Sequence, residues 1–200
     1  RISKKINKNI PVILGGNHIS NAVIDYGYSF DNSSNLPKLI EDLEDENIDY
    51  GMVGEGETSM IQLVDAILNN KDVSNIPGLV KKLSDGKYLI NKNNQQHDLN
   101  LLEKPARHLV NMEGYFKIGA FQSAKSRSKR VLSVMCSRGC PEKCTFCTTP
   151  QMWGTNIRWR STEHIMDEIR NDVKDYNIGE IQFLDDTLTV HKKNLYSLCD

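Results

Sequence analysis

Four of the five cysteines in this 200-residue chain fall within twelve positions, at Cys136, Cys140, Cys144 and Cys147. The last three form a Cys-x3-Cys-x2-Cys motif on one short stretch. Cysteine thiolates bind zinc or iron–sulfur clusters, and a structural zinc site usually takes two cysteine pairs a dozen or more residues apart. Three thiolates without a second pair can hold three irons of a cubane and leave the fourth iron open. The motif therefore favours a catalytic iron–sulfur site with Cys140, Cys144 and Cys147 as ligands.

The neighbouring candidates have simpler interpretations. Cys136 stands at the end of a β-rich run, where we expect a small buried residue. We expect His164 to be exposed in the first turn of a helix and Cys199 to be an ordinary helix-face cysteine. One alternative stays open, a zinc-binding interaction module that takes Cys136 as a fourth ligand beside the three motif cysteines.

The elements around the motif predict where it lies in the fold. The motif follows a predicted strand at 131–136 and precedes a helix that Ser161 or Thr162 can cap and that Gly179 ends. The apolar face of this helix comprises Ile165, Met166, Ile169, Val173 and Tyr176. The motif is therefore a loop at the carboxyl end of a strand.

A second strand is predicted at 181–184, with Asp185 and Asp186 at its carboxyl end, and another helix starts near His191. Strand, loop, helix, strand, loop, helix is the order of the first two units of a β/α barrel. In such barrels the chemistry lies at the carboxyl ends of the strands. The cysteine loop and the two aspartates are therefore expected at the same end of the sheet.

The first half also alternates strand and helix signals. Strands are predicted at 9–14, closed by Gly15 and Gly16, and at 50–53, before the turn Gly54-Glu55-Gly56-Glu57. Helical patterns begin at Leu36 and cover 60–68. This alternation predicts a parallel, doubly wound sheet. Two further strands, 78–83 and 87–90, are predicted to form a hairpin around Asp85-Gly86.

Composition limits the class of protein. The 25 Lys and Arg residues against 26 Asp and Glu give a net charge of −1, which excludes a wholesale polyanion binder and makes nucleic acid an unexpected partner. The longest apolar stretches, of about five residues, are far short of the roughly 20 that span a bilayer. No secretory signal is present, so we expect a cytoplasmic protein. A polar stretch suggests a boundary, which gives domains at 1–91 and 128–200 with a linker at 92–127.

The cysteine motif, with Phe146 before its last cysteine, resembles the signature loop of radical S-adenosylmethionine (SAM) enzymes. Six other stretches are similar to the branch of that family that carries an N-terminal cobalamin (B12)-binding domain: Val12–His18, Val53–Glu57, Ile76–Leu79, Ser137–Pro141, Arg158–Ser161 and Phe183–Thr187. The resemblance implies an α/β fold, the C-terminal part of a Rossmann-like cobalamin domain followed by the first βα units of a radical SAM barrel. The chain starts without Met and stops inside a helical pattern, so we expect a fragment truncated at both ends.

The resemblance also implies cofactors and roles. The three motif cysteines would ligate a [4Fe–4S] cluster, whose open iron binds SAM, and a flavodoxin- or ferredoxin-type protein would donate electrons. Phe146 would pack beside the cluster and adenine, or simply within the loop. Asp185 and Asp186 would accept hydrogen bonds from the SAM ammonium, unless one caps the next helix. Arg160, or Arg158, would pair with the SAM carboxylate or form a structural ion pair.

For cobalamin, the resemblance points to the two glycine-containing turns. Gly15 and Gly16 would let the backbone approach the nucleotide tail of the cofactor, or would form only a tight turn. In the turn made of Gly54, Glu55, Gly56 and Glu57, the glutamates would bind cofactor amides, or Glu57 would serve a helix N-terminus. The Asp-x-His-x-x-Gly motif that supplies a cobalt ligand in such families is absent from the chain, and His18 is not assigned that role.

The activity implied is SAM cleavage to a 5′-deoxyadenosyl radical, followed by methyl transfer or by rearrangement or cyclisation of a small biosynthetic substrate. A further alternative is a radical SAM methylthiotransferase that acts on RNA. That branch has a second cysteine-bearing N-terminal domain, whereas residues 1–120 contain no cysteine.

Overall fold

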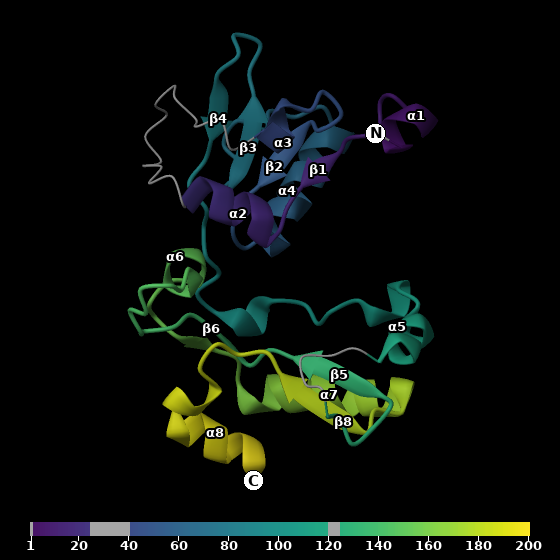
Figure 1. Ribbon diagram of the computed structural model, residues 1–200, viewed down its shortest axis with the longest axis vertical. Coiled ribbons are helices and arrows are strands. Elements are labelled where there is room, and N and C mark those ends of the chain that lie inside the picture. The colour runs from purple at the N-terminus through teal and green to yellow at the C-terminus, as the bar shows by residue number, and fades with distance from the viewer. Residues whose placement is uncertain (1, 25–40, 120–124) are drawn as a thin grey trace. The chain divides into compact units, whose positions relative to one another are not determined.

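The computed structural model describes residues 2–24, 41–119 and 125–200 and divides the chain into two compact units (Figure 1). Unit 1 comprises residues 1–96 and 145–153, and unit 2 comprises residues 97–144 and 154–200. The predicted domain limits, 1–91 and 128–200, stay a prediction. Among the described residues, no helix is long and apolar enough to cross a membrane.

Unit 1 contains a four-stranded sheet in the order β1 (Ile13–Leu14), β2 (Tyr50–Met52), β3 (Leu79–Lys82) and β4 (Tyr88–Ile90). β1 and β2 are parallel, as predicted. β3 pairs antiparallel with both β2 and β4. The sheet is therefore mixed rather than parallel throughout, because the predicted hairpin adds its two strands directly to β2.

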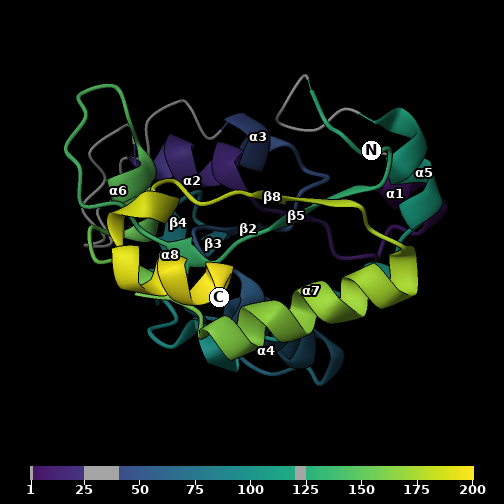
Figure 2. The ribbon, with the colours of Figure 1, turned by 90° about the horizontal axis from the view of Figure 1, so that it is seen from below.

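Helices cover both faces of this sheet, since consecutive strand residues point to opposite sides. On one face, α2 (Asn17–Ile24) and α3 (Glu41–Glu44) pack against Val53 and Val80. On the other, α4 (Glu57–Leu68) packs against Met52 and Leu79. Figure 2 shows α2 and α3 on one side of these strands and α4 on the other. The helix predicted from Leu36 lies partly outside the described residues, and α3 falls in its described part. A short helix, α1 (Ile2–Ile6), precedes β1.

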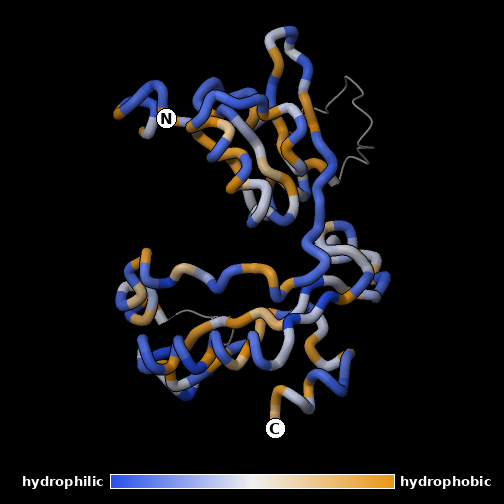
Figure 3. The backbone as a smooth tube through the Cα atoms, turned by 180° about the vertical axis from the view of Figure 1, so that it is seen from behind, coloured by the Kyte–Doolittle hydropathy of each residue, from blue (hydrophilic) through white to orange (hydrophobic). Residues whose placement is uncertain are grey.

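The polar segment 91–96 is bound along unit 1, and we name it the strap. Its contacts are with the residues before β3 and with the turn after β2: Asn91 Nδ2 donates to the carbonyls of Ser74 (2.8 Å) and Ile76 (2.7 Å), Gly78 N to Lys92 O (3.1 Å), and Gln96 N to Glu55 Oε2 (3.3 Å). Figure 3 shows the strap as a hydrophilic stretch. The polar groups that predict a linker here therefore make hydrogen bonds with the rest of unit 1.

Unit 2 contains a parallel pair of strands, β5 (Val131–Val134) and β8 (Glu180–Phe183), joined through α7 (Thr162–Tyr176). α8 (Lys192–Cys199) follows β8, with His191 at its N-cap as predicted. The predicted order of two βα units is confirmed, whereas their membership of a barrel stays a prediction. The core between these elements is apolar: Phe116, Leu132, Val134, Cys136, Ile165 and Ile178.

α7 begins where the sequence predicts but ends earlier. His164 N donates to Ser161 Oγ (3.1 Å), so Ser161 is the N-cap. The helix ends at Tyr176, because Asn177 adopts the left-handed conformation (φ 50°). The prediction that Gly179 ends the helix is wrong. Gly179 is needed for another reason, since a Cβ there would lie 2.5 Å from Ser128 Oγ.

The rest of the predicted linker is also structured. It contains η1 (Leu99–Leu101), η2 (Arg107–Leu109) and α5 (Met112–Ile118). Asp98 caps η1 by accepting from Asn100 N, and Asn111 caps α5 by accepting from Gly114 N. Asp and Asn are frequent both in caps and in linkers, so composition did not distinguish the two.

Candidate functional site

The cysteine loop is closed by a two-stranded neck, β6 (Ser137–Arg138) paired antiparallel with β7 (Arg158–Trp159). Gly139 starts the loop with φ +104°, and a Cβ there would lie 2.4 Å from Asn156 O. Cys140 N donates to Gly154 O (3.2 Å). The neck therefore fixes both ends of a loop at the carboxyl end of β5. Two-residue strands leave too short a pattern to be found in a sequence.

The three motif cysteines are free thiols in different surroundings: Cys140 is buried, Cys144 is exposed and Cys147 is half-buried. Phe146 is 89% exposed. In the described part of the chain, no group of three His, Cys, Asp or Glu side chains is arranged to hold a metal ion. The donor chemistry and the solvent access of the loop fit an iron–sulfur cluster, and the ligand set stays a prediction.

Cys136 is a core residue, as expected from the sequence. Its side chain is fully buried. Burial, together with the charge of Asp185, raises the pKa of the Cys136 thiol to about 12. The thiol packs among the apolar core residues of unit 2, and the four-cysteine zinc site stays an alternative for experiment to decide.

Asp185 is bound by groups of its own chain. Its Oδ2 accepts from Cys136 N (3.0 Å) and its Oδ1 from Ser137 Oγ (2.5 Å). Leu184 N donates to Val134 O (2.9 Å), which continues the pairing of the two strands up to the aspartate. Asp186, the other predicted SAM contact, is exposed.

Arg160 is held by several partners within unit 2. Its guanidinium donates to Met135 O (2.9 Å), to Glu168 Oε2 (2.5 Å) and to His164 Nδ1 (3.3 Å). Its backbone N–H donates to Cys136 O (2.9 Å). His164 is half-buried rather than exposed as predicted, and burial followed by the charge of Arg160 lowers its pKa.

A buried ion cluster beneath these residues was not foreseen. Arg107 lies 2.9 Å from Glu168 Oε1 and 3.2 Å from Asp172 Oδ2, and it donates to Ser133 O (3.1 Å). Glu168 is 2% exposed. Burial raises the pKa of the Asp172 carboxyl, against the effect of Arg107. The available signal was the pair of acids four residues apart beside the apolar face of α7.

In unit 1 the two glycine-containing turns lie at the carboxyl ends of the parallel strands β1 and β2. Buried Ser20 connects them, since its Oγ accepts from Gly54 N (2.9 Å) and donates to Gly16 O (3.0 Å). Gly15 is exposed. Gly16 has φ +85°, and among the described residues a Cβ there would meet nothing within 4 Å. Packing against the described part of the chain therefore does not explain Gly16.

The second turn is explained largely by the strap. Gly54 has φ +75°, and a Cβ there would lie 1.9 Å from Asn93 Nδ2. Glu55 is buried and accepts from the strap at Gln96 N. Gly56 is the N-cap of α4 and Glu57 its exposed first residue. The position of Glu57 fits the alternative of a residue that serves the helix N-terminus.

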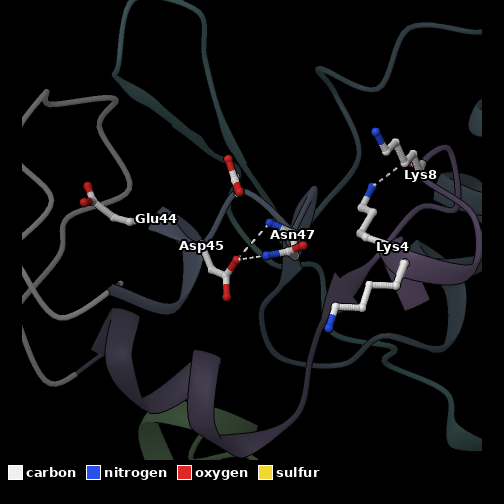
Figure 4. Close-up of a pocket in the computed structure, with 7 residues that line it drawn as sticks. Lys4, Lys8, Glu44, Asp45 and Asn47 are labelled. Atoms are coloured by element: carbon white, nitrogen blue, oxygen red, sulfur yellow. Dashed lines mark hydrogen bonds between the residues drawn. The ribbon is translucent and has the colours of Figure 1, made fainter. Parts of the chain in front are cut away.

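A surface pocket of unit 1 lies away from these turns (Figure 4). It is lined by Lys4, Lys5, Lys8 and the segment 44–47. Lys4 forms an ion pair with Asp49 (2.7 Å), and Asn47 N donates to Asp45 Oδ1 (2.9 Å). The lysines line one side of this pocket and the acids of segment 44–47 line the other, and it contains no predicted site residue, so we assign it no ligand.

The match to known families lies on the segment of the chain that carries the cysteine loop. Residues 134–198 match the radical SAM superfamily, and this stretch contains the motif, the neck, α7 and β8. The chain belongs to the radical SAM superfamily. Within it, the chain is similar to methyltransferases and to a cyclase.

Curated relatives cover both halves of the chain. It is 31% identical to the cytidylyl-2-hydroxyethylphosphonate methyltransferase of Streptomyces wedmorensis, across 74% of this chain and 32% of that protein. It is 32% identical to an uncharacterized methyltransferase of Pyrococcus horikoshii (96% and 37%). It is 27% identical to the anaerobic magnesium-protoporphyrin IX monomethyl ester cyclase of Rubrivivax gelatinosus (100% and 32%). The chain spans about a third of the length of these relatives.

Two solved structures share the fold. The radical SAM methyltransferase TsrM from Kitasatospora setae, with tryptophan and a SAM analogue bound, aligns with a TM-score of 0.66 at 20% identity, over 98% of this chain and 34% of that one. The cobalamin-dependent radical SAM enzyme OxsB aligns with a TM-score of 0.58 at 15% identity, over 99% and 29%. At these identities the likeness establishes the fold.

Proposed function

We propose that this chain is part of a radical SAM enzyme that uses a [4Fe–4S] cluster, SAM and cobalamin to methylate or cyclise a small biosynthetic substrate. The observation that carries the proposal is the Cys140-x3-Cys144-x2-Cys147 loop, closed by the neck at the carboxyl end of β5, inside the stretch that matches the superfamily. Free thiols in this loop also favour a reducing, cytoplasmic location.

Different residues of the chain have different roles in this proposal. Cys140, Cys144 and Cys147 would hold the cluster, which when bound supplies the electron that cleaves SAM to methionine and a 5′-deoxyadenosyl radical. An electron donor of the flavodoxin or ferredoxin type would reduce the cluster again. Phe146 presents an exposed ring on which adenine can stack, and the Asp186 carboxylate can accept from the SAM ammonium.

Support for cobalamin comes from unit 1. Ser20 holds the Gly15-Gly16 turn beside the Gly54 turn, and the space that the described residues leave at Gly16 would allow a ligand to approach the backbone. Ligands of open α/β sheets bind at this end of the strands. Cobalamin appears with the cluster in the TsrM structure and with SAM in an OxsB structure, which have the same fold.

The substrate class is inferred from the relatives. One methylates a cytidylyl phosphonate and another cyclises a porphyrin ester, as their names say, and tryptophan is the substrate in the TsrM structure. All three are small organic molecules. We therefore expect a small-molecule substrate for this chain, and no role for RNA.

The test is electron paramagnetic resonance (EPR) on the chain reconstituted anaerobically with iron and sulfide and reduced with dithionite. We expect a [4Fe–4S] signal that changes when SAM is added. Cys144→Ala should lose the signal, whereas Cys199→Ala, the matched removal of an exposed cysteine on α8, should keep it.

Metal analysis decides the alternative. Iron with sulfide in the wild-type chain supports the cluster. Stoichiometric zinc without iron, unaffected by SAM and lost in Cys144→Ala, would overturn the proposal in favour of a zinc-binding module. A cluster that persists in Cys144→Ala would exclude the proposed ligand set.

A further inference from the structure

The end of β5 is held from two sides by the elements that follow the cysteine loop. Asp185, after β8, accepts from Cys136 N and Ser137 Oγ. Arg160, after β7, donates its guanidinium to Met135 O and its backbone N–H to Cys136 O. Residues 135–137 are thus bound on both sides, two residues before the loop begins at Gly139.

We infer that Asp185 and Arg160 are positioning residues that fix the start of the cysteine loop. The family resemblance left two roles open for each residue, a SAM contact or a structural one, and in the structure the polar contacts given above are with the protein. We name this pair of residues and their contacts the clamp. The inference rests on the proposed function in one respect, that the loop holds a cluster.

The geometry supports a role in orientation. Both carboxylate oxygens of Asp185 are engaged, one with a backbone N–H and one with a hydroxyl, so the carboxylate fixes the direction of the chain as well as its position. Ser137 then enters β6, whose pairing with Trp159 sets the path toward Cys140. A ligand cysteine must be held to within fractions of an ångström for a metal site to form, which such support provides.

Arg160 is itself held in place by buried charged residues of unit 2. Its guanidinium bonds Glu168, which is almost fully buried and also pairs with Arg107. Arg107 in turn donates to Ser133 O in β5. Ion pairs among buried charged groups therefore connect the clamp to the core of unit 2. These groups are paired with one another, as expected, since an unpaired charge is costly to bury.

The first test uses the metal-free chain and hydrogen exchange at the Cys136 amide. Asp185→Ala should speed exchange at that amide by about tenfold or more, the factor expected for loss of one charge-assisted hydrogen bond. Ser137→Ala should speed it less, and Ser137→Thr, which keeps the hydroxyl, should restore protection. Glu113→Ala is the matched control, since its carboxylate pairs with Arg130 before β5 and should leave Cys136 unaffected.

The second test follows the reconstituted cluster. Asp185→Ala should lose iron at least about fivefold faster than wild type on dilution with a chelator, because the ligand loop is less ordered. In the fraction that keeps its cluster, the SAM-induced change in the EPR signal should persist. Thermal unfolding of Asp185→Ala and Glu113→Ala distinguishes loss of positioning from general loosening of the fold.

The opposite pattern would overturn the inference. If Cys136 stays protected and iron is retained in Asp185→Ala while the SAM-induced change disappears, Asp185 contacts SAM and does not position the loop. If the wild-type chain takes up no cluster at all, the proposed function fails, yet hydrogen exchange in the metal-free chain still decides whether the clamp exists.

Discussion

At the scale of single residues, the cysteines of this chain differ in solvent access. Cys144 and Cys199 are exposed, whereas Cys136 is fully buried in the core of unit 2. Only the thiolate reacts, so both burial and pKa control reactivity. Chemical modification should therefore separate the exposed Cys144 and Cys199 from the buried Cys136.

We predict that iodoacetamide at pH 8 modifies Cys144 and Cys199 in the metal-free chain and leaves Cys136 unmodified until a denaturant is added. Peptide mass spectrometry measures each site. The physical reason is the inaccessible thiol of Cys136, whose pKa is raised to about 12. Modification of Cys136 at the rate of Cys199 in the folded chain would contradict its placement in the core.

The same thiol makes stability depend on pH. Its pKa is raised from an ordinary 9.0 to about 12 on folding, so the folded state holds the proton more tightly than the unfolded state. The resulting stabilisation is complete below about pH 9 and is lost as the pH rises from 9 toward 12. Denaturant unfolding should show that the free energy of unfolding falls between pH 9 and 12, and that it falls less steeply in Cys136→Ala. Equal slopes in the two proteins would exclude this contribution.

We also predict that Glu168→Gln destabilises unit 2 strongly. It leaves Arg107 and Arg160 without their shared carboxylate in a buried site, for which a loss of about 3 kcal/mol is typical. Asp167→Asn, one position earlier on α7, removes an exposed pair with Lys104 and should change stability little. Urea unfolding measures both, and similar effects would argue that Glu168 is solvated.

At the scale of elements, the long periodic segments were predictable and the short or polar ones were not. α4, α7 and the hairpin β3–β4 follow from helical spacing and from Asp85-Gly86. The neck has two residues in each strand, too few for a pattern to show. The sequence of the strap looks like a linker because its hydrogen bonds join residues 12 to 41 positions apart, and local composition does not reveal such pairs.

The strap leads to a prediction about Gly54. Gly54→Ala places a Cβ on Asn93 and should release the strap, so that the backbone at the exposed Lys92 becomes free to enter the active site of trypsin. Gly86→Ala is the matched control: Gly86 has a similar positive φ (+82°), but a Cβ there meets nothing within 4 Å. Each change costs about 1 kcal/mol in backbone strain, so only the clash distinguishes them. Equal cleavage after Lys92 in both variants would show that the strap is not held at Gly54.

At the scale of the whole molecule, each candidate site lies at the carboxyl ends of parallel strands: the glycine-containing turns follow β1 and β2, and the cysteine loop follows β5. The motif residues and the two glycine-containing turns were predictable from sequence because they are contiguous. Ser20, which joins the turns, and the partners of Asp185 and Arg160 were not, because they depend on which strands are neighbours.

The two cofactors are assigned to different residues of the chain, so we expect each to bind without the other. We predict that Gly16→Ala weakens cobalamin binding at least about tenfold, since a methyl group enters the space beside the turn, while iron uptake is unchanged. Cys144→Ala should show the reverse. Cobalamin titration by absorbance and iron analysis measure the two, with Gly86→Ala as the control for backbone strain. Loss of both cofactors in either variant would contradict independent loading.

The clamp bears on how this sequence can diverge. At Met135 and Cys136 the clamp binds only peptide groups: the carbonyl of Met135, and both the N–H and the carbonyl of Cys136. The clamp therefore does not restrict which side chains can stand at these two positions. The volume and polarity that the core accepts restrict them instead. Replacement is more restricted at Asp185, Ser137 and Arg160, because these residues make their contacts through side-chain atoms. Random mutagenesis selected for cluster retention should recover many residue types at 135, a few small apolar ones at 136, and almost none at 185.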